Sequence, residues 1–238
     1  MPPKSINMKK FLLLALLVAI VSCAKETTPD LIVKGSIKGL KKGTIYLKKE
    51  LDTTIVTVDS VIINGTPEFE LHSALESPEI FYLYLDKNSS EEDRITFFAD
   101  KGVTEIHTTM KRFVYDAKIN GSEQQKVLEK YKLMVAKFNE KNLDLIKEEL
   151  ESSGDTSKLN RIQKDYENNL KRRYLYTVNF ALNNNDSEVA PFLALTEIYN
   201  AKYNLLDTIN KSLTPKVKAS KYGKELQKFV DNIKAQEE

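Results

Sequence analysis

The spacing of apolar residues changes once along this chain, near Gly121, and that change constrains the fold more than any other feature. From Leu31 to about Ile119, apolar and polar residues alternate in short runs between turn residues, a pattern typical of half-buried β-strands. From Ser122 onward, apolar residues recur every three to four positions, the period of amphipathic helices. The pattern predicts an α+β protein, with an N-terminal antiparallel β-sandwich followed by a C-terminal helical segment.

The β half, residues 31–120, contains about eight or nine candidate strands. Asn64-Gly65 predicts a hairpin, because both residues tolerate positive φ. The last strand is expected at Val114 to Ile119. Short strands at regular spacing with turn residues between them favour an antiparallel sandwich or a barrel.

The helical half, residues 121–238, is predicted to contain amphipathic helices that pack on each other or on the sheet. Ser187 is expected to cap a helix, and Thr214-Pro215 to open the last helix as its N-cap and first residue. The apolar stripes and helical stretches are Val127–Leu150 (including Ile146), Leu159–Ala181, Phe192–Tyr199, Lys202–Leu213 and Leu226–Ile233.

The N-terminus has the layout of a secretory signal: Lys9-Lys10, an apolar run from Phe11 to Val21, then Ser22-Cys23. The run is about half of the roughly twenty residues that a membrane-spanning helix needs. Ile20-Val21-Ser22-Cys23 resembles the lipobox of bacterial lipoproteins. That resemblance implies cleavage before Cys23 and acylation of this residue, which would anchor the protein stably in a membrane. The alternative is a non-lipidated signal with a chance cysteine.

These features predict a lipoprotein signal peptide at residues 1–22 and a lipidated tether at residues 23–30. Removing the three lysines of residues 1–22 leaves 33 basic and 34 acidic residues, a formal net charge of −1. A chain without excess positive charge is not expected to bind nucleic acid. Cys23 is the only cysteine, so once lipidated it leaves no thiol for disulfides, structural zinc or redox chemistry.

Several motifs together carry a family resemblance. They are the lipobox, Val33–Leu40, Gly43–Leu47, Val58-Asp59-Ser60, Asn64-Gly65, Tyr82–Leu85, Asn120-Gly121-Ser122 and Ser220–Lys224. The chain resembles the uncharacterised N-terminal domain of thiol–disulfide interchange lipoproteins of Bacteroidetes. In that family a β-sandwich and a helical segment precede a thioredoxin-like domain, which the resemblance places after Glu238. Because residues 1–238 contain no Cys-x-x-Cys pair, the resemblance transfers fold and location but no catalytic residue.

Other candidate residues each have a structural alternative. His72 and His107 could bind zinc only with carboxylates to complete the site, and ordinary surface histidines are favoured, so no metal and no cofactor is predicted. Glu91-Glu92-Asp93 could bind calcium, but a solvated loop is favoured. Lys171-Arg172-Arg173 could contact phosphates or lipid headgroups, although a solvated helix face is favoured. Five tyrosines could line a groove, although core packing is favoured: Tyr166, Tyr174, Tyr176, Tyr199 and Tyr203.

Three short segments resemble the O-glycosylation sequon of exported Bacteroidetes proteins, which would place glycans on Thr53, Ser60 and Thr208. The sequence favours a non-enzymatic, lipid-anchored protein of the bacterial cell envelope, held on the inner or outer membrane, that binds or scaffolds a periplasmic partner. One alternative is the accessory half of a thiol–disulfide interchange system whose thioredoxin-like domain is on another chain. Another is a lipoprotein that captures a peptide or glycan at the junction of sandwich and helices.

Overall fold

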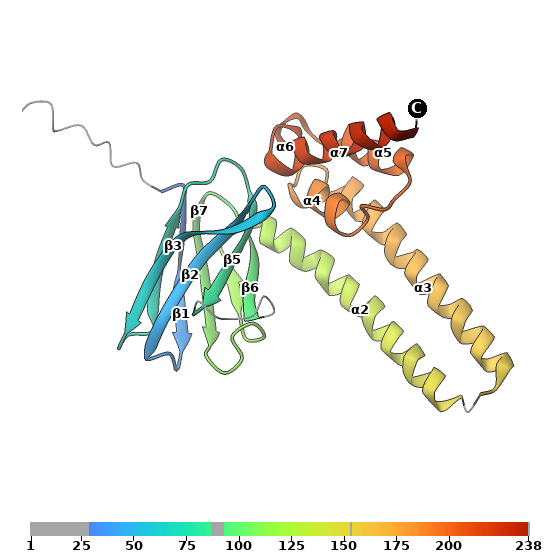
Figure 1. Ribbon diagram of the computed structural model, residues 1–238, viewed down its shortest axis with the longest axis horizontal. Coiled ribbons are helices and arrows are strands. Elements are labelled where there is room, and N and C mark those ends of the chain that lie inside the picture. The colour runs from blue at the N-terminus through green and yellow to red at the C-terminus, as the bar shows by residue number, and fades with distance from the viewer. Residues whose placement is uncertain (1–28, 87–92, 153, 238) are drawn as a thin grey trace, which may run out of the picture.

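The computed structural model describes residues 29–86, 93–152 and 154–237. Its β half contains two four-stranded sheets, ordered β4-β1-β7-β8 and β3-β2-β5-β6, and its second half is helical, so the predicted α+β class is confirmed (Figure 1). The strands are β1 (Leu31–Lys38), β2 (Lys42–Leu51), β3 (Thr54–Asn64), β4 (Glu68–Ser73), β5 (Glu79–Leu85), β6 (Arg94–Ala99), β7 (Gly102–Thr109) and β8 (Lys118–Asn120).

The two sheets bury a common apolar core between them. Alternate residues of each strand point inward, as the period of two in the sequence predicts. In β1, for example, Val33 and Ile37 are fully buried while Lys38 is exposed. The core residues from the other strands include Ile45, Leu47, Phe69, Leu71, Phe81, Leu83, Ile95, Phe97 and Ile106.

Strand direction differs from the sequence prediction in one place. β1 pairs in parallel with β7, from Leu31 opposite Gly102 to Lys38 opposite Thr109, so the sandwich is not purely antiparallel. The Asn64-Gly65 turn is also not a hairpin within one sheet, because β3 and β4 belong to different sheets. Alternation of apolar residues identifies the buried face of a strand, but it does not specify the neighbouring strand or its direction.

The last strand is shorter than predicted. Residues 111–116 form turns, and only Lys118–Asn120 pairs with β7. Two hydroxyl groups of β7 hold the turn, because Thr108 donates to the Phe113 carbonyl oxygen at 2.6 Å and Thr109 donates to Asp116 at 2.8 Å. The apolar residues before Lys118 therefore pack as a turn and not as a strand.

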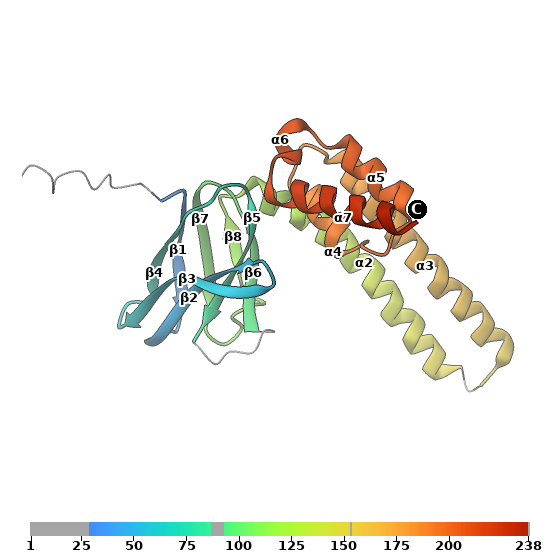
Figure 2. The same cartoon turned by 45° about the horizontal axis from the view of Figure 1, so that its top comes forward.

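The helices form a long hairpin and a compact group beside it (Figures 1 and 2). α2 (Glu123–Glu151) and α3 (Thr156–Asn183) extend away from the sandwich, while the later helices pack near its upper edge in Figure 1. The later helices are α4 (Val189–Thr196), α5 (Tyr203–Ser212), α6 (Pro215–Lys218) and α7 (Lys221–Glu237). Within the described ranges, no helix is long and apolar enough to cross a bilayer.

The far half of the hairpin is less buried than its apolar stripe predicts. Ile146 and Leu150 are 47% and 82% exposed, whereas Tyr131 and Leu145 are buried. α2 and α3 pack on each other throughout, but the remaining helices cover only the half nearer the sandwich. Two helices alone bury one side of each other, so apolar residues at the edge of the stripe remain in solvent.

The predicted helix starts are partly correct. Ser122 caps α2 by accepting a hydrogen bond from the Gln125 N–H at 3.0 Å. Thr214-Pro215 does form an N-cap and first residue, but it opens the four-residue α6, and α7 begins only at Lys221. Ser187 accepts a hydrogen bond from the Val189 N–H at 3.2 Å, although the N-cap position of α4 is Glu188.

Close packing of α6 on α7 requires glycine at position 223. A Cβ there would lie 2.0 Å from the Val217 carbonyl oxygen and 2.8 Å from the Lys218 Cα. Helix propensity alone predicts that Gly223→Ala stabilises the protein by about 1 kcal/mol. We expect the opposite sign, a loss of about 1–3 kcal/mol in the free energy of unfolding, because the backbone of α6 must shift. Urea denaturation followed by circular dichroism measures this change.

The matched control is Lys228→Ala, an exposed position in the same helix, where a change within about 0.5 kcal/mol is expected. If Gly223→Ala were more stable than the wild type, the close packing described for α6 and α7 would be contradicted.

Candidate functional site

Aromatic rings join the helical half to the outer face of the β5–β6 sheet. Phe98 of β6 packs edge-on against Phe192 of α4 and Tyr222 of α7, with centroid distances of 5.6 and 5.7 Å. Phe192 and Tyr222 also contact each other at 5.2 Å. Together with Ile80 of β5 and Leu128 of α2, these residues form a buried apolar cluster. The cluster fixes three helices against one face of the sandwich.

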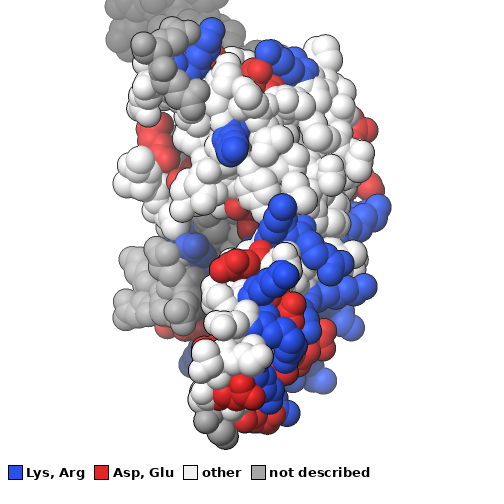
Figure 3. All heavy atoms as spheres, turned by 90° about the vertical axis from the view of Figure 1, so that its right-hand side faces the viewer, with Lys and Arg blue, Asp and Glu red and all other residues white. Residues whose placement is uncertain are grey.

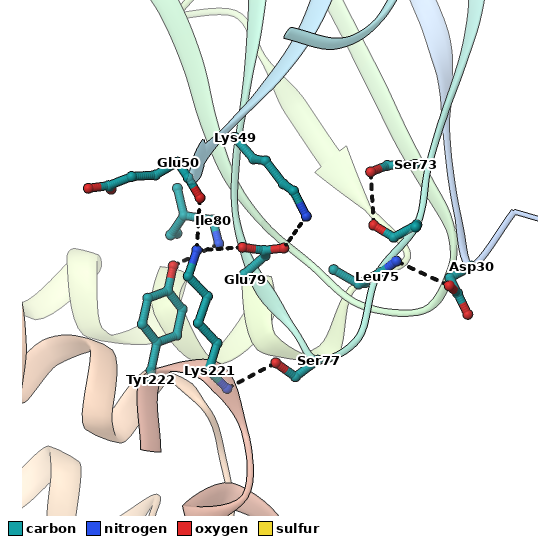
Figure 4. Close-up of polar contacts among 11 residues, drawn as sticks. Asp30, Lys49, Glu50, Ser73, Leu75, Ser77, Glu79, Ile80, Lys221 and Tyr222 are labelled. Carbon is teal, nitrogen blue, oxygen red and sulfur yellow. Dashed lines mark hydrogen bonds and ion pairs between the residues drawn. The ribbon is translucent and has the colours of Figure 1, made fainter. Parts of the chain in front are cut away.

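Polar contacts continue the β-ladder into α7 (Figure 4). Pairing of β2 with β5 ends at Lys49 opposite Phe81. Beyond that point the Ile80 N–H donates to the Tyr222 hydroxyl at 3.0 Å, and the Lys221 ammonium donates to the Glu50 carbonyl oxygen at 3.0 Å. Two side chains at the start of α7 thus satisfy the Ile80 N–H and the Glu50 carbonyl, which lie past the last paired residues of the β2–β5 ladder.

Glu79 adds an ion-pair network to this junction. Its side chain is 7% exposed and lies 2.9 Å from the Lys49 ammonium and 2.6 Å from the Lys221 ammonium (Figure 4). Burial of a carboxylate costs free energy that close cations with good geometry offset. The network ties β2, β5 and α7 together. On α2, the Gln125 side chain accepts a hydrogen bond from the Phe98 N–H at 2.9 Å.

Removal of one hydroxyl tests how firmly the junction is held. We expect Tyr222→Phe to lower the free energy of unfolding by about 1–3 kcal/mol, because the buried Ile80 N–H loses its acceptor while ring packing is kept. The control is Tyr199→Phe, since Tyr199 is 61% exposed, and a change within about 0.5 kcal/mol is expected there. If urea denaturation gave the same free energy change for Tyr222→Phe and Tyr199→Phe, the Tyr222 hydroxyl would not stabilise the junction.

A cleft with a volume of about 650 Å³ lies at this junction, within the size range of small-molecule sites. Its walls come from the β4–β5 loop, the β6–β7 turn, the start of α2, the start of α4, and α6. This junction cleft is lined by Glu76, Ser77, Pro78, Asp100, Lys101, Gly121, Glu123, Gln124, Glu188, Lys216, Ala219 and Ser220.

Hydrogen bonds across the cleft wall hold it in shape. Asp100 accepts from the Ser122 hydroxyl at 3.1 Å and from the Gln124 N–H at 3.0 Å, which joins the β6–β7 turn to α2. The Gln124 side chain in turn accepts from the Ser187 hydroxyl at 2.5 Å, which joins α2 to the segment before α4. The sandwich and two helices therefore share one polar network.

Glu188 is the least satisfied group in the junction cleft. The residue is 1% exposed, and its Oε2 atom has no hydrogen-bond partner among the described residues. Burial raises the pKa of its carboxyl above the ordinary value of 4.5. Its own backbone N–H and Lys216 act in the opposite direction, whereas Asp100 and Asp186 raise the pKa further. A buried carboxylate without a donor is unusual and needs an explanation.

The raised pKa predicts how stability depends on pH. As pH rises past 4.5, Glu188 loses its proton in the unfolded state before it does so in the folded state. The wild type should therefore lose stability relative to Glu188→Gln as pH rises, while the two proteins are most alike in acid. Melting temperatures measured across this range test the expectation. Glu76→Gln, an exposed carboxylate of the same cleft, serves as control. A gap in melting temperature between Glu188→Gln and the wild type that shrinks as pH rises would contradict a raised pKa for Glu188.

The two histidines lie apart on the outer face of the β4-β1-β7-β8 sheet. His72 contacts Glu70 at 3.0 Å, and His107 contacts Ser36 at 2.9 Å. Their partners on β1, Ile32 and Ser36, are four residues apart, or about 13 Å along the strand. Throughout the described part of the chain, no group of three or more His, Cys, Asp or Glu residues could hold a metal ion.

The structure describes the basic cluster at residues 171–173 and one of the three acids at residues 91–93. Glu91 and Glu92 lie outside the described residues, whereas Asp93 is exposed just before β6. Lys171 and Arg172 are exposed on α3, and Arg173 pairs with Glu197 at 2.8 Å. On the face drawn in Figure 3, Lys and Arg side chains gather over the hairpin with Asp and Glu among them. This mixture of charges agrees with a solvated helix face.

The five tyrosines do not form one groove. Tyr176 stacks on Tyr131 at 6.0 Å inside the hairpin, and Tyr203 packs against the core of the helical half. Tyr166 is exposed on α3. Only Tyr174 and Tyr199 line the same hollow, beside Arg173 and Glu197.

Of the four predicted modification sites, one lies outside the described residues and three lie on the protein surface. Cys23 lies outside the described residues. Thr53, Ser60 and Thr208 are all exposed, so glycosylation at these sites stays a prediction. Thr53 lies in the β2–β3 turn, Ser60 within β3, and Thr208 within α5, where its hydroxyl donates to the Asn204 carbonyl oxygen at 2.6 Å.

No sequence pattern identifies Glu79, Asp100, Glu188 or Lys216 as candidate site residues. Glu188 follows Ser187 directly before an apolar helix, and this pattern indicates helix capping. Nothing in the pattern shows that α6 and the β6–β7 turn pack near the same carboxylate.

The fold and cleft define an α+β protein in which a two-sheet sandwich is joined to helices around a polar hollow. A domain described as Domain of unknown function (DUF4369) is found at residues 31–128, which cover the sandwich and the first residues of α2. Asp100 and Gln124 lie inside the matched range, whereas Glu188 and Lys216 lie outside it. Comparison with curated proteins and with solved structures gives no match.

Proposed function

We propose that this protein is a lipid-anchored component of the bacterial cell envelope that binds a small ligand in the junction cleft and catalyses no reaction. The observation that carries this proposal is Glu188, a buried carboxylate in the wall of a cleft with an oxygen that has no donor among the described residues. Aromatic packing and the Glu79 ion pairs hold the helices on the sandwich, so the elements that form the cleft walls are in place without a ligand. A preformed cleft of this kind supports binding with little loss of conformational entropy.

The position of the tether supports a site close to the membrane. Asp30, just before β1, accepts from the Leu75 N–H at 3.1 Å and pairs with Lys101 at 3.0 Å. Lys101 holds the pKa of Asp30 below its ordinary value and also lines the junction cleft. The seven peptide units that join Cys23 to Asp30 span at most about 25 Å. A lipid on Cys23 would therefore keep the cleft near the bilayer surface.

A second candidate function is scaffolding of a periplasmic protein, and the hairpin favours it. Leu143, Ile146, Leu150 and Leu170 are exposed apolar residues on α2 and α3. Under the resemblance to thiol–disulfide interchange lipoproteins, the partner would be a separate thioredoxin-like chain. Crosslinking in membranes from position 150 tests this role, and failure to recover a thioredoxin-like lipoprotein would remove its support.

The anchor is tested at Cys23. We expect Cys23→Ala to abolish incorporation of labelled palmitate and to release the protein from the membrane fraction, because the thiol that carries the lipid is lost. Ser22→Ala, which leaves the thiol in place, is the matched control and should keep both properties. Palmitate incorporation that survives Cys23→Ala would overturn the proposed anchor.

Ligand binding is tested by filling the cleft. Ala219 is exposed and lines the cleft, so Ala219→Trp should occupy it without disturbing the core. A protein-free extract of the cell envelope is expected to raise the melting temperature of the full-length wild type but not that of Ala219→Trp. Equal shifts for both proteins, or no shift for either, would contradict binding in this cleft.

A further inference from the structure

The missing donor to Glu188 limits what the junction cleft can bind. The carboxylate is 1% exposed, and none of the described side chains or backbone groups donates to Oε2. Asp100, a half-buried acid of the same wall, already accepts from Ser122 and Gln124. Among the acids of this wall that the structure describes, Glu188 is the buried one with an oxygen free to accept from a strong donor. Hydrogen bonds between a buried carboxylate and an ammonium are among the strongest that proteins make.

The charges that face the cleft favour a ligand with a positive end. Four carboxylates line it, against two lysines. Of these lysines, Lys101 is paired with Asp30, whereas Lys216 is exposed and makes no ion pair within the described residues. Lys216 lies close enough to Glu188 to lower the pKa of its carboxyl. The cleft thus offers one acceptor without a donor and one cation without a partner, near each other.

We propose that the junction cleft binds an aminoethyl phosphate group, with its primary ammonium donating to Glu188 and its phosphate beside Lys216. This inference rests on the proposed binding function of the cleft and names its ligand class. The same group occurs free as phosphoethanolamine and as the headgroup of ethanolamine phospholipids. With a lipid on Cys23, the short span to Asp30 would hold the cleft within reach of such headgroups at the bilayer surface.

The chemistry of the ammonium sets the selectivity. A primary ammonium carries three N–H donors, so it can supply the hydrogen bond that Oε2 lacks. A quaternary ammonium, as in phosphocholine, has no N–H and would leave this oxygen unpartnered. Phosphocholine is therefore a matched negative probe, since it differs from phosphoethanolamine only in the substitution of its nitrogen.

Binding should also depend on pH. The ligand's ammonium pairs best with ionised Glu188, and burial favours the neutral carboxyl in the empty cleft. The charged groups that face Glu188 are Lys216 of α6, Asp100 of the β6–β7 turn and Asp186 before α4. Affinity should weaken as pH falls and Glu188 becomes protonated.

Calorimetric titration of full-length protein with phosphoethanolamine tests the proposal. The wild type should bind it saturably and should not bind phosphocholine. Glu188→Gln should weaken binding by about 10- to 100-fold, the value expected for loss of a charged hydrogen bond. Lys216→Met changes an exposed residue and should also weaken binding. Glu140→Gln, an exposed acid of α2 that does not line the cleft, should leave binding within about twofold.

Equal affinity of Glu188→Gln and wild type would overturn the inference, as would equal binding of phosphocholine. No binding of phosphoethanolamine would also overturn it. If the envelope extract still stabilises the wild type and not Ala219→Trp in that case, the cleft remains a binding site and only the ligand class is wrong. Melting temperatures of the variants without ligand show whether each one is folded.

The source of the group is assigned with vesicles and the Cys23→Ala protein, whose binding does not depend on the anchor. Sedimentation with phosphatidylethanolamine vesicles, but not with phosphatidylcholine vesicles, and competition by free phosphoethanolamine would identify the lipid headgroup. Binding of free phosphoethanolamine without vesicle binding supports the same cleft chemistry with a soluble ligand.

Discussion

The outer face of β5 and β6 cannot remain in water, and the rest of the architecture depends on how it is covered. Ile80 and Phe98 point away from the sandwich core and are buried only because α2, α4 and α7 lie against them. A sandwich with two solvated outer faces would carry polar residues at these positions. Apolar residues there make the helical half a required part of the folded β half.

The polar contacts specify how that apolar contact is made. Hydrophobic burial has little directional preference, so helices could cover β5 and β6 in many orientations. Tyr222 and Lys221 allow few of them, because each must reach a particular backbone group at the end of the β2–β5 ladder. The junction cleft is the space left between surfaces fixed in this way. Its shape is consequently set by the fold and does not require a mobile loop among the residues that line it.

Much of the secondary structure could be predicted from the sequence because its signals are local. Alternation in β1 and the period of α3 each depend on residues close together in the chain. The parallel pairing of β1 with β7 could not be predicted, because both strands have the same alternation as antiparallel ones. Ile146 and Leu150 fit the helical stripe as well as Leu145 does, and only the position of the later helices decides that they remain exposed.

The candidate site was less predictable than the fold for the same reason. Glu188 and Asp100 are ordinary surface residues by their sequence context. The burial of Glu188 and the hydrogen bonds of Asp100 depend on segments that come together only in the folded protein, at the β6–β7 turn, α2 and α6. A binding site at the junction of sandwich and helices is one of the hypotheses that the sequence supports, but no local pattern identifies the acids and lysines that line this cleft.

The contact between Ile80 and Tyr222 joins residues that are 142 positions apart. A chain that emerges from its N-terminus therefore completes every strand long before the helix that covers β5 becomes available. Until α4 and α7 arrive, Phe98 and Ile80 lack most of the helical residues that bury them, on a sheet whose interior is otherwise complete. Such intermediates fold slowly and tend to associate through their exposed apolar surface. The order in which this polypeptide is synthesised thus leaves a period in which the β half exposes an apolar face that the finished fold covers.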